Sequence, residues 1–287
     1  MEFDMAKSTA SKILLSVPAF ILLVIVLLTI TAPLISPYDP DVQSLADRLQ
    51  GPSAAHLLGT DALGRDTLSR VLHGGQFSLS VALITTLFSL LVGTVLGLLS
   101  ALRGGWLDEI FLRINDLLLA LPEIVIALLI IAVMGPGFFT MVLSVGVVAW
   151  TPTARLVRSI AAQALSTHHV EASKHVGASR WFILRHHVLP FVAGPVLAQA
   201  ALRFGLLLVL LGSLSYLGIG VQPPQSDWGS MLAEAQPHAI RSPWGLLVPG
   251  AAIFLVSFCV TLLGNRITHV LGGNDVLYIK TKAEAHG

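Results

Sequence analysis

Residues 170–190 read VEASKHVGASRWFILRHHVLP and lie between two long apolar runs. Residues 171–174 suit a short helix, and Gly177 can adopt a positive φ and end it. A second short helix is expected over about 179–188, with Pro190 stopping it. The pattern predicts a helix–turn–helix hairpin with more apolar residues than a solvated loop needs, and hence a docking partner. These apolar residues are Val176, Trp181, Ile183 and Leu184.

The composition around this hairpin predicts an integral membrane protein. Of the 287 residues, 54% are hydrophobic and only 11% are charged, and the mean hydropathy is +0.81. A soluble domain carries roughly 25% charged residues. The net charge of +1 gives no strong field, so nucleic acid is not an expected partner. Cys259 is the single cysteine, which excludes a disulfide framework and a multi-cysteine metal site.

Six apolar runs are long enough to cross a bilayer, which takes about 20 residues. They are residues 13–35, 77–101, 110–134, 138–160, 192–221 and 246–271. Because lipid cannot satisfy the backbone, each run is expected to be a helix. The first run exceeds the roughly 7–15 residues of a signal-peptide core and lacks a clean cleavage site. It is therefore predicted to be a retained span.

The positive charges predict the orientation of these spans. An even number of spans puts both termini on one side of the membrane. If that side is the cytoplasm, 13 of the 17 Lys and Arg residues lie inside and four lie outside, as the positive-inside rule requires. The predicted segments are a cytoplasmic N-terminus 1–12, an outer loop 36–76, a five-helix core 77–271 containing the inner loop 163–190, and a cytoplasmic tail 272–287.

Several sequence motifs of enzymes and channels are missing from the chain. It has no G-x-x-x-x-G-K-[ST] loop for nucleotide phosphates and no H-E-x-x-H, G-x-S-x-G or C-x-x-C motif. The absence of an Arg-rich span argues against a voltage sensor. We find no convincing inverted repeat of the kind that secondary transporters carry. A stand-alone secondary transporter nevertheless remains the alternative from another class.

The hairpin resembles the EAA signature of bacterial ABC importer permeases. Glu171-Ala172-Ser173 matches its opening, with Ser173 where the third residue is usually Ala. Gly177 follows the glutamate by six residues, and Ile183 and Leu189-Pro190 match the end of the signature.

Four further segments resemble the dipeptide, oligopeptide and nickel permease family, and within it the C-type subunit. They are HLLGTDALGRD at 56–66; Asp116 through Leu121-Pro122; Trp150 with Ala154-Arg155 and Arg158; and LSYLGIGVQPP at 214–224 followed by Trp228-Gly229. All stand in the family's order along the chain, so the resemblance covers most of its length.

The resemblance implies an all-α membrane protein with six transmembrane helices, the type I ABC importer permease fold, and a cytoplasmic coupling helix. Such a subunit lies in the bacterial cytoplasmic (inner) membrane and forms the pathway with a B-type permease. Two ABC ATPase subunits hold ATP and magnesium, and an extracytoplasmic binding protein delivers the substrate. The chain itself is then neither an enzyme nor a cofactor-binding protein. Di- or oligopeptides are the expected substrates, with nickel or a metal–chelator complex as the alternative.

Three sets of residues are candidate functional positions. The coupling positions implied by the resemblance are Glu171, Ala172, Ser173, Gly177, Ile183, Leu189 and Pro190. Candidates for the translocation path are Asp116, Glu123, Gln199 and Arg203, because polar and charged groups within spans are expensive and often functional. The outer candidates, expected to form a structural cap that contributes to binding-protein docking, are Asp61, Gly64, Arg65, Asp66, Asp227 and Trp228.

Plainer interpretations stand beside these candidates. Asp116 could form a helix-end pair with Arg113, and Arg203 could extend to the cytoplasmic interface with its charge in water. Gly93 and Gly97 form a G-x-x-x-G pattern that favours close helix packing. The inner loop also holds five histidines, which we interpret as exposed polar groups rather than a metal site. They are His168, His169, His175, His186 and His187.

Overall fold

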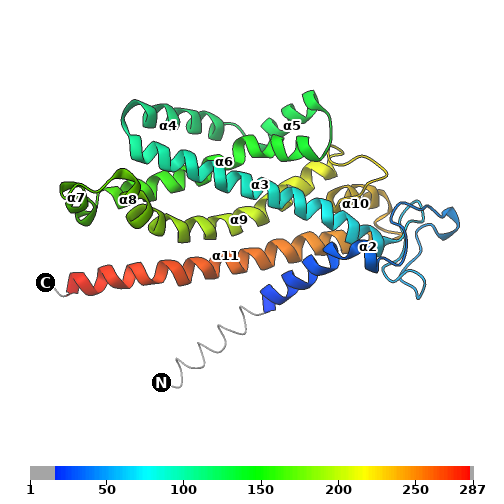
Figure 1. Ribbon diagram of the computed structural model, residues 1–287. Coiled ribbons are helices and arrows are strands. Elements are labelled where there is room, and N and C mark those ends of the chain that lie inside the picture. Colours follow the sequence, from blue (N-terminus) through cyan, green and yellow to red (C-terminus); the bar gives the residue numbers. More distant parts are fainter. Residues whose placement is uncertain (1–16, 285–287) are drawn as a thin grey trace, which may run out of the picture. The chain divides into compact units, whose positions relative to one another are not determined.

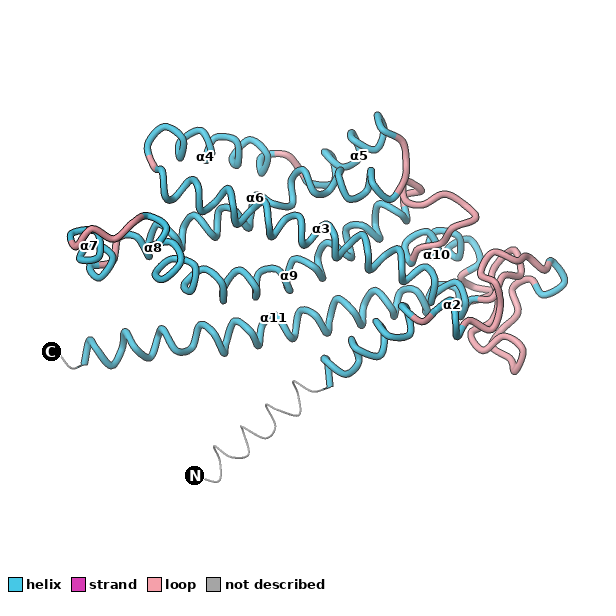
Figure 2. Tube along the Cα trace, viewed as in Figure 1, coloured by secondary structure: helices cyan, strands magenta, loops and turns pink. Residues whose placement is uncertain are grey.

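The computed structural model describes residues 17–284, and side chains through residue 267. The described part is helical, without a strand, and contains one isolated bridge between Thr60 and Asp66 (Figures 1 and 2). The helices are Val17–Ile30, α2 (Ala32–Ile35), α3 (Thr67–Arg103), α4 (Gly105–Ala120), α5 (Glu123–Met134), α6 (Phe138–Leu165), α7 (His168–His175), α8 (Arg180–Ile183), α9 (Leu189–Tyr216), α10 (Trp228–Ala235) and α11 (Trp244–Glu284). The predicted N-terminal segment 1–12 lies outside the described residues.

Within residues 17–284, four helices are long and apolar enough to cross a membrane. They are α3, α6, the continuous helix Arg180–Tyr216, and α11 over Trp244–Ile267. A fifth candidate is the pair α4 and α5, which is bent by 84°. The helix Val17–Ile30 is apolar but shorter, and the first residues of the span predicted there lie outside the described part.

The prediction of one straight span over 110–134 is wrong. The chain breaks between α4 and α5, where Leu121 is extended with φ −100° and ψ 140°. Pro122 explains the break, because its ring disfavours helical geometry in the preceding residue and its nitrogen donates no hydrogen bond.

The prediction that Pro190 stops a helix is also wrong. Helix continues from Arg180 to Tyr216, with a wide π turn over Leu184–Val188 just before the proline. A π turn replaces i→i+4 hydrogen bonds with i→i+5 hydrogen bonds. The helix can therefore continue past Pro190, although the proline nitrogen donates no hydrogen bond.

The chain forms two compact units. The first contains residues 17–85, 124–145 and 204–261. Its largest buried side chain is Trp228 at the start of α10, whose indole nitrogen donates to the carbonyl of Val71 at 2.8 Å. Close packing surrounds this tryptophan, because a Cβ on Gly229 would lie 2.2 Å from the carbonyl oxygen of Gly212.

The second unit contains residues 86–123, 146–203 and 262–284. Here Gly93 and Gly97 of α3 pack directly against α6. A Cβ on Gly93 would lie 2.8 Å from the carbonyl oxygen of Trp150, and one on Gly97 would lie 2.5 Å from that of Ala154. These distances confirm the close packing that the G-x-x-x-G pattern predicts. In the same unit, α7 and α8 connect α6 to α9 (Figure 1).

Candidate functional site

The turn of the hairpin depends on Gly177. This residue has φ +84°, in the left-handed region that glycine occupies without strain. Its N–H donates to the carbonyl of Lys174 at 3.0 Å, and the next N–H, from Ala178, donates to the carbonyl of Ser173 at 3.0 Å. The following helix begins at a serine N-cap, because Ser179 Oγ accepts from the N–H of Phe182 at 3.2 Å. The sequence therefore predicted the turn, the first short helix and the start of the second helix, but not that the second continues to Tyr216.

One side of the hairpin is packed inside its own unit. Ile183 is buried, and Leu184 and Leu189 pack against the same apolar cluster. That cluster also contains Leu98, Val157, Ala161, Ala164, Val170, Val188, Val192 and Val196. The expectation that Ile183 and Leu184 need an external partner is therefore wrong, because they fasten the hairpin to α3, α6 and α9.

The opposite side of the hairpin is open to its surroundings. Val176 is 86% exposed and Trp181 is 67% exposed, and the neighbouring Phe182 is also exposed. Of the coupling positions, Glu171, Ala172, Gly177 and Pro190 are exposed and Ser173 is half-buried. An apolar patch rimmed by polar groups marks an interaction site. The hairpin therefore has one side packed in its own unit and one exposed side that can receive a partner.

The hairpin histidines make only local contacts. His168 lies 3.6 Å from Glu171, and the rings of His169 and His187 lie 5.5 Å apart. Across the described residues, no group of three or more His, Cys, Asp or Glu is arranged to hold a metal ion.

Two ion pairs join α4 to α6 in the second unit. Nε and Nη2 of Arg158 each donate to Asp108 at 2.5 Å, and Ser100 Oγ donates to the same carboxylate. Asp116 pairs with Arg155 at 2.5 Å. The expected pair of Asp116 with Arg113 is wrong, because Arg113 lies 3.6 Å from Glu109.

Two backbone carbonyls of α6 near Pro152 accept hydrogen bonds from side chains. Because Pro152 has no N–H, the carbonyl of Val148 loses its helical donor, and Thr151 Oγ1 replaces it at 2.8 Å. The next carbonyl, of Ala149, accepts from Ser89 Oγ at 2.6 Å and from Nη2 of Arg203 at 3.1 Å.

Arg203 thus points into its unit and not toward a water interface. Its Nη2 also lies 4.0 Å from Oε1 of Glu123, the first residue of α5. Gln199, one turn earlier in α9, is half-buried. Of the path candidates, the structure brings together Glu123 and Arg203, whereas Asp116 is occupied by Arg155.

The outer loop of the first unit is held by its own motif residues. Asp66 caps α3, because Oδ2 accepts from both the N–H and the hydroxyl of Ser69 at 2.8 Å. Its other oxygen lies 2.9 Å from Nδ1 of His56. Gly64 has φ +75°, and a Cβ there would lie 1.7 Å from the carbonyl oxygen of Ser44, so only glycine fits.

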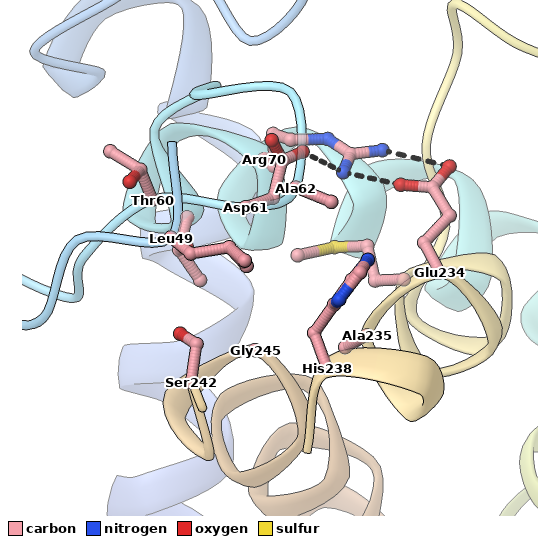
Figure 3. A pocket seen from close by; sticks show the side chains of 12 residues that line it. Leu49, Thr60, Asp61, Ala62, Arg70, Glu234, Ala235, His238, Ser242 and Gly245 are labelled. Atoms are coloured by element: carbon pink, nitrogen blue, oxygen red, sulfur yellow. Dashed lines mark hydrogen bonds and ion pairs between the residues drawn. The ribbon is translucent and has the colours of Figure 1, made fainter. Parts of the chain in front are cut away.

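Two buried arginines join this loop to α10. Asp61 accepts from Arg65 Nε and from Arg70 Nη1, both at 2.6 Å. Glu234 accepts from Arg65 at 2.6 Å and from Arg70 at 2.7 Å. Figure 3 shows Arg70 between the two carboxylates, beside a small cavity also lined by His238 and Ser242. The cluster balances two positive charges against two negative charges.

Asp227 and Trp228 hold the start of α10. Oδ1 of Asp227 accepts from the N–H groups of Gly229 and Ser230 at 2.7 and 3.0 Å, and the Ser230 hydroxyl completes a capping box. Burial raises the pKa of the Asp227 carboxyl, and the hydrogen bonds from Ser230 and Gly229 oppose that rise.

The outer candidates are therefore mostly structural. Arg65, Asp66, Asp227 and Trp228 are each at most 4% exposed, so they shape the outer surface from beneath it. Sequence reasoning missed Arg70 and Glu234. Arg70 is one of the four Lys and Arg residues that the predicted orientation places outside, and their small number was the signal that could have identified it. Nothing in the sequence pairs Glu234 with residues about 165 positions away.

Long apolar helices, one bent helix pair and an exposed hairpin fit a membrane permease. The chain belongs to the family of binding-protein-dependent transport system inner membrane components, the permeases of ABC importers, which it matches over residues 93–271. Residues 17–52 match the N-terminal transmembrane domain of oligopeptide transport permease C, so the chain is a C-type subunit. It is a multi-pass inner membrane protein, and a stand-alone secondary transporter is thereby excluded.

Similar proteins agree over most of the chain. A glutathione transport system permease of Pectobacterium atrosepticum is 38% identical over 253 residues, covering 88% of this chain and 84% of the relative. A probable D,D-dipeptide transport permease of Escherichia coli is 35% identical, covering 88% and 85%. A di/tripeptide transport permease of Pseudomonas aeruginosa is 36% identical, covering 87% and 84%.

Solved structures support the fold. A chain of an inward-facing methionine ABC transporter aligns with a TM-score of 0.57 and 17% identity, covering 70% of this chain and 95% of that one. A chain of an amino acid ABC transporter aligns with a TM-score of 0.54 and 16% identity, covering 69% and 91%. The type I permease fold predicted from the sequence is confirmed.

Proposed function

We propose that this chain is the pathway-forming C-type permease of an ATP-driven importer of dipeptides or oligopeptides. The observation that carries the substrate class is the agreement among relatives at 35–38% identity, which are named for glutathione, dipeptide and di/tripeptide transport. In this proposal the chain pairs with a B-type permease, and peptide passes between the two subunits.

The hairpin is the proposed dock for an ABC ATPase subunit. Its exposed apolar residues Val176, Trp181 and Phe182 suit insertion into a groove of that partner. Its buried residue Ile183 ties the hairpin to the helix ends, so movement of the ATPase would move the spans. ATP and magnesium bind the two ATPase subunits in this scheme, and nucleotide shifts the balance between inward-facing and outward-facing packings.

The outer cap is the proposed platform for the binding protein. Its charged residues are buried, so direct contacts would fall to exposed neighbours such as Leu57, Leu63 and Ile240. Both termini are proposed to be cytoplasmic, because that orientation places 13 of the 17 Lys and Arg residues inside.

The substrate is tested by uptake in a strain lacking this subunit, with and without the restored gene. Labelled dipeptide, labelled oligopeptide, and labelled nickel, free and chelated, are supplied in parallel. We expect the gene to restore peptide uptake. Restoration of metal uptake alone would refute the peptide assignment and leave the permease assignment intact.

Coupling is tested with two hairpin variants. Gly177→Asp places a side chain at φ +84°, and Glu171→Lys reverses an exposed charge on the proposed docking side. Each should abolish ATP-driven uptake while the protein still inserts into the membrane. Glu109→Lys, the same reversal at an exposed glutamate of α4, is the matched control and should retain uptake. Normal uptake in both hairpin variants, at equal membrane levels, would refute the docking role.

A further inference from the structure

Glu123 and Arg203 form an incomplete ion pair at the bend between α4 and α5. Their closest atoms, Oε1 of Glu123 and Nη2 of Arg203, are 4.0 Å apart. Charge-assisted hydrogen bonds between such groups usually measure about 2.7–2.9 Å. Oε1 of Glu123 and Nε of Arg203 are buried and find no hydrogen-bond partner among the described residues. Both charges therefore keep unused hydrogen-bonding capacity.

Two other ion pairs of the same unit, each joining two helices, are closed. Asp108 binds Arg158 and Asp116 binds Arg155, each at 2.5 Å. The contact between Glu123 and Arg203 is longer than either of these two. Each of these two charged groups also interacts favourably with a neighbouring part of the backbone. Arg203 donates to the carbonyl of Ala149, and Glu123 occupies the N-terminus of α5, where a helix favours negative charge.

The partial burial of Glu123 and Arg203 limits what their exposed atoms can contact. The side chains of Glu123 and Arg203 are 25% and 14% exposed in this single chain. Charged groups within spans almost always face a protein interior or a water-filled cavity, because contact with lipid is expensive. An incompletely paired buried charge is also unfavourable until a ligand or partner completes its contacts. The exposed parts of both groups therefore belong to a surface that the assembled transporter covers or fills with water.

We propose that Glu123 and Arg203 form a two-charge subsite for the termini of a zwitterionic peptide on the translocation path. Arg203 receives the C-terminal carboxylate, whose two oxygens match the guanidinium fork. Glu123 receives the N-terminal ammonium. The subsite rests on the proposed function, and it adds that the permease itself recognises free peptide termini after the binding protein has released them.

The test uses the complete transporter in proteoliposomes with its binding protein. Three cargoes are compared, namely alanyl-alanine, its C-terminal amide and its N-acetyl form, each at a concentration that saturates the binding protein. We expect the unmodified transporter to prefer free termini by roughly tenfold, the size of one charge-assisted hydrogen bond. Arg203→Gln should remove only the preference for the free carboxylate. Glu123→Gln should remove only the preference for the free ammonium.

The control is the exposed pair Glu109 and Arg113 of α4, whose charges lie 3.6 Å apart. Glu109→Gln and Arg113→Gln make the same chemical changes and should retain both preferences. If Arg203→Gln fails to assemble, Glu123→Gln alone decides, because the preference for the free ammonium depends on Glu123.

Three results would overturn the subsite while leaving peptide transport established. They are equal loss of all three cargoes in both pathway variants, retention of both preferences, and an unmodified transporter that does not distinguish the cargoes. A transporter that moves no peptide at all would refute the proposed function and the subsite with it.

Discussion

Asp227 shows how much one residue of the outer cap contributes. Its Oδ1 accepts the N–H groups of Gly229 and Ser230, which would otherwise lack partners at the first turn of α10. The same carboxylate is buried, so its charged form loses hydration. A motif match places an Asp before a Trp-Gly pair, but the match alone distinguishes neither the cap nor the burial.

The raised pKa of Asp227 predicts a pH dependence of stability. Because burial raises the folded pKa of Asp227 above the ordinary value of 3.8, the folded state holds the proton more tightly than the unfolded state. The contribution of Asp227 to stability should therefore rise as pH falls through the folded pKa toward 3.8, and be smallest above the folded pKa. Thermal unfolding of the purified transporter across this range checks the prediction.

Asp227→Asn provides the reference for that measurement, because it preserves an oxygen for the cap and cannot ionise. The melting temperature of the unsubstituted protein, minus that of Asp227→Asn, should increase toward acidic pH. A difference that stays constant or decreases would contradict the prediction.

At the scale of elements, α4 is fastened to α6 by two ion pairs of different burial. The pair of Asp108 with Arg158 is bidentate and mostly shielded, whereas that of Asp116 with Arg155 is largely exposed. Exposed pairs contribute about 0–1 kcal/mol. Removing one partner of a shielded pair leaves the other charge without compensation and costs more.

Asp108→Asn should therefore destabilise the protein more than Asp116→Asn. We expect a loss of roughly 1–3 kcal/mol for the first and about 0–1 kcal/mol for the second. Denaturant titration of the two variants in the same detergent checks the order. A double-mutant cycle with Arg158→Gln should show coupling to Asp108, and its absence would mean that the ion pair contributes no net stability.

The elements also show where sequence reasoning succeeds. Apolar runs predicted the helical segments, and Gly177 and Ser179 predicted the turn and start of the hairpin helices. The two errors concern prolines, because Pro122 breaks a helix that hydropathy treats as one span, whereas Pro190 is absorbed by a π turn. Hydropathy cannot separate these outcomes, which depend on whether neighbouring turns can adjust their hydrogen bonds.

Site prediction has a similar limit. The motif residues Gly64 and Asp66 were identified, but their partners lie elsewhere in the loop or beyond it. Partners of Arg70 and Arg203 come from segments more than 50 positions away, at Glu234 and Ala149. Such contacts are set by helix packing, which a single sequence does not encode in any local pattern.

At the scale of the whole molecule, the distribution of charge predicts which side of the membrane each loop faces. Four Lys and Arg residues flank or occupy the predicted outer segments, and 13 flank or occupy the inner ones. The positive-inside rule then predicts that the hairpin lies in the cytoplasm and residues 36–76 lie outside. ATP is available only in the cytoplasm, so the proposed coupling requires this orientation.

Cysteine labelling tests the orientation directly. The single cysteine, Cys259, is buried, and Cys259→Ala gives a background without thiols. Ala54→Cys lies in the exposed outer loop and Lys174→Cys on the exposed hairpin. In spheroplasts, a membrane-impermeant maleimide should label the cysteine at position 54, and that at position 174 only after lysis. Ala54→Cys should retain uptake, since it replaces no buried side chain, and Lys174→Cys is compared for labelling at an equal membrane level. The reverse labelling pattern would place the hairpin outside, away from any ATPase, and would refute the proposed topology and coupling together.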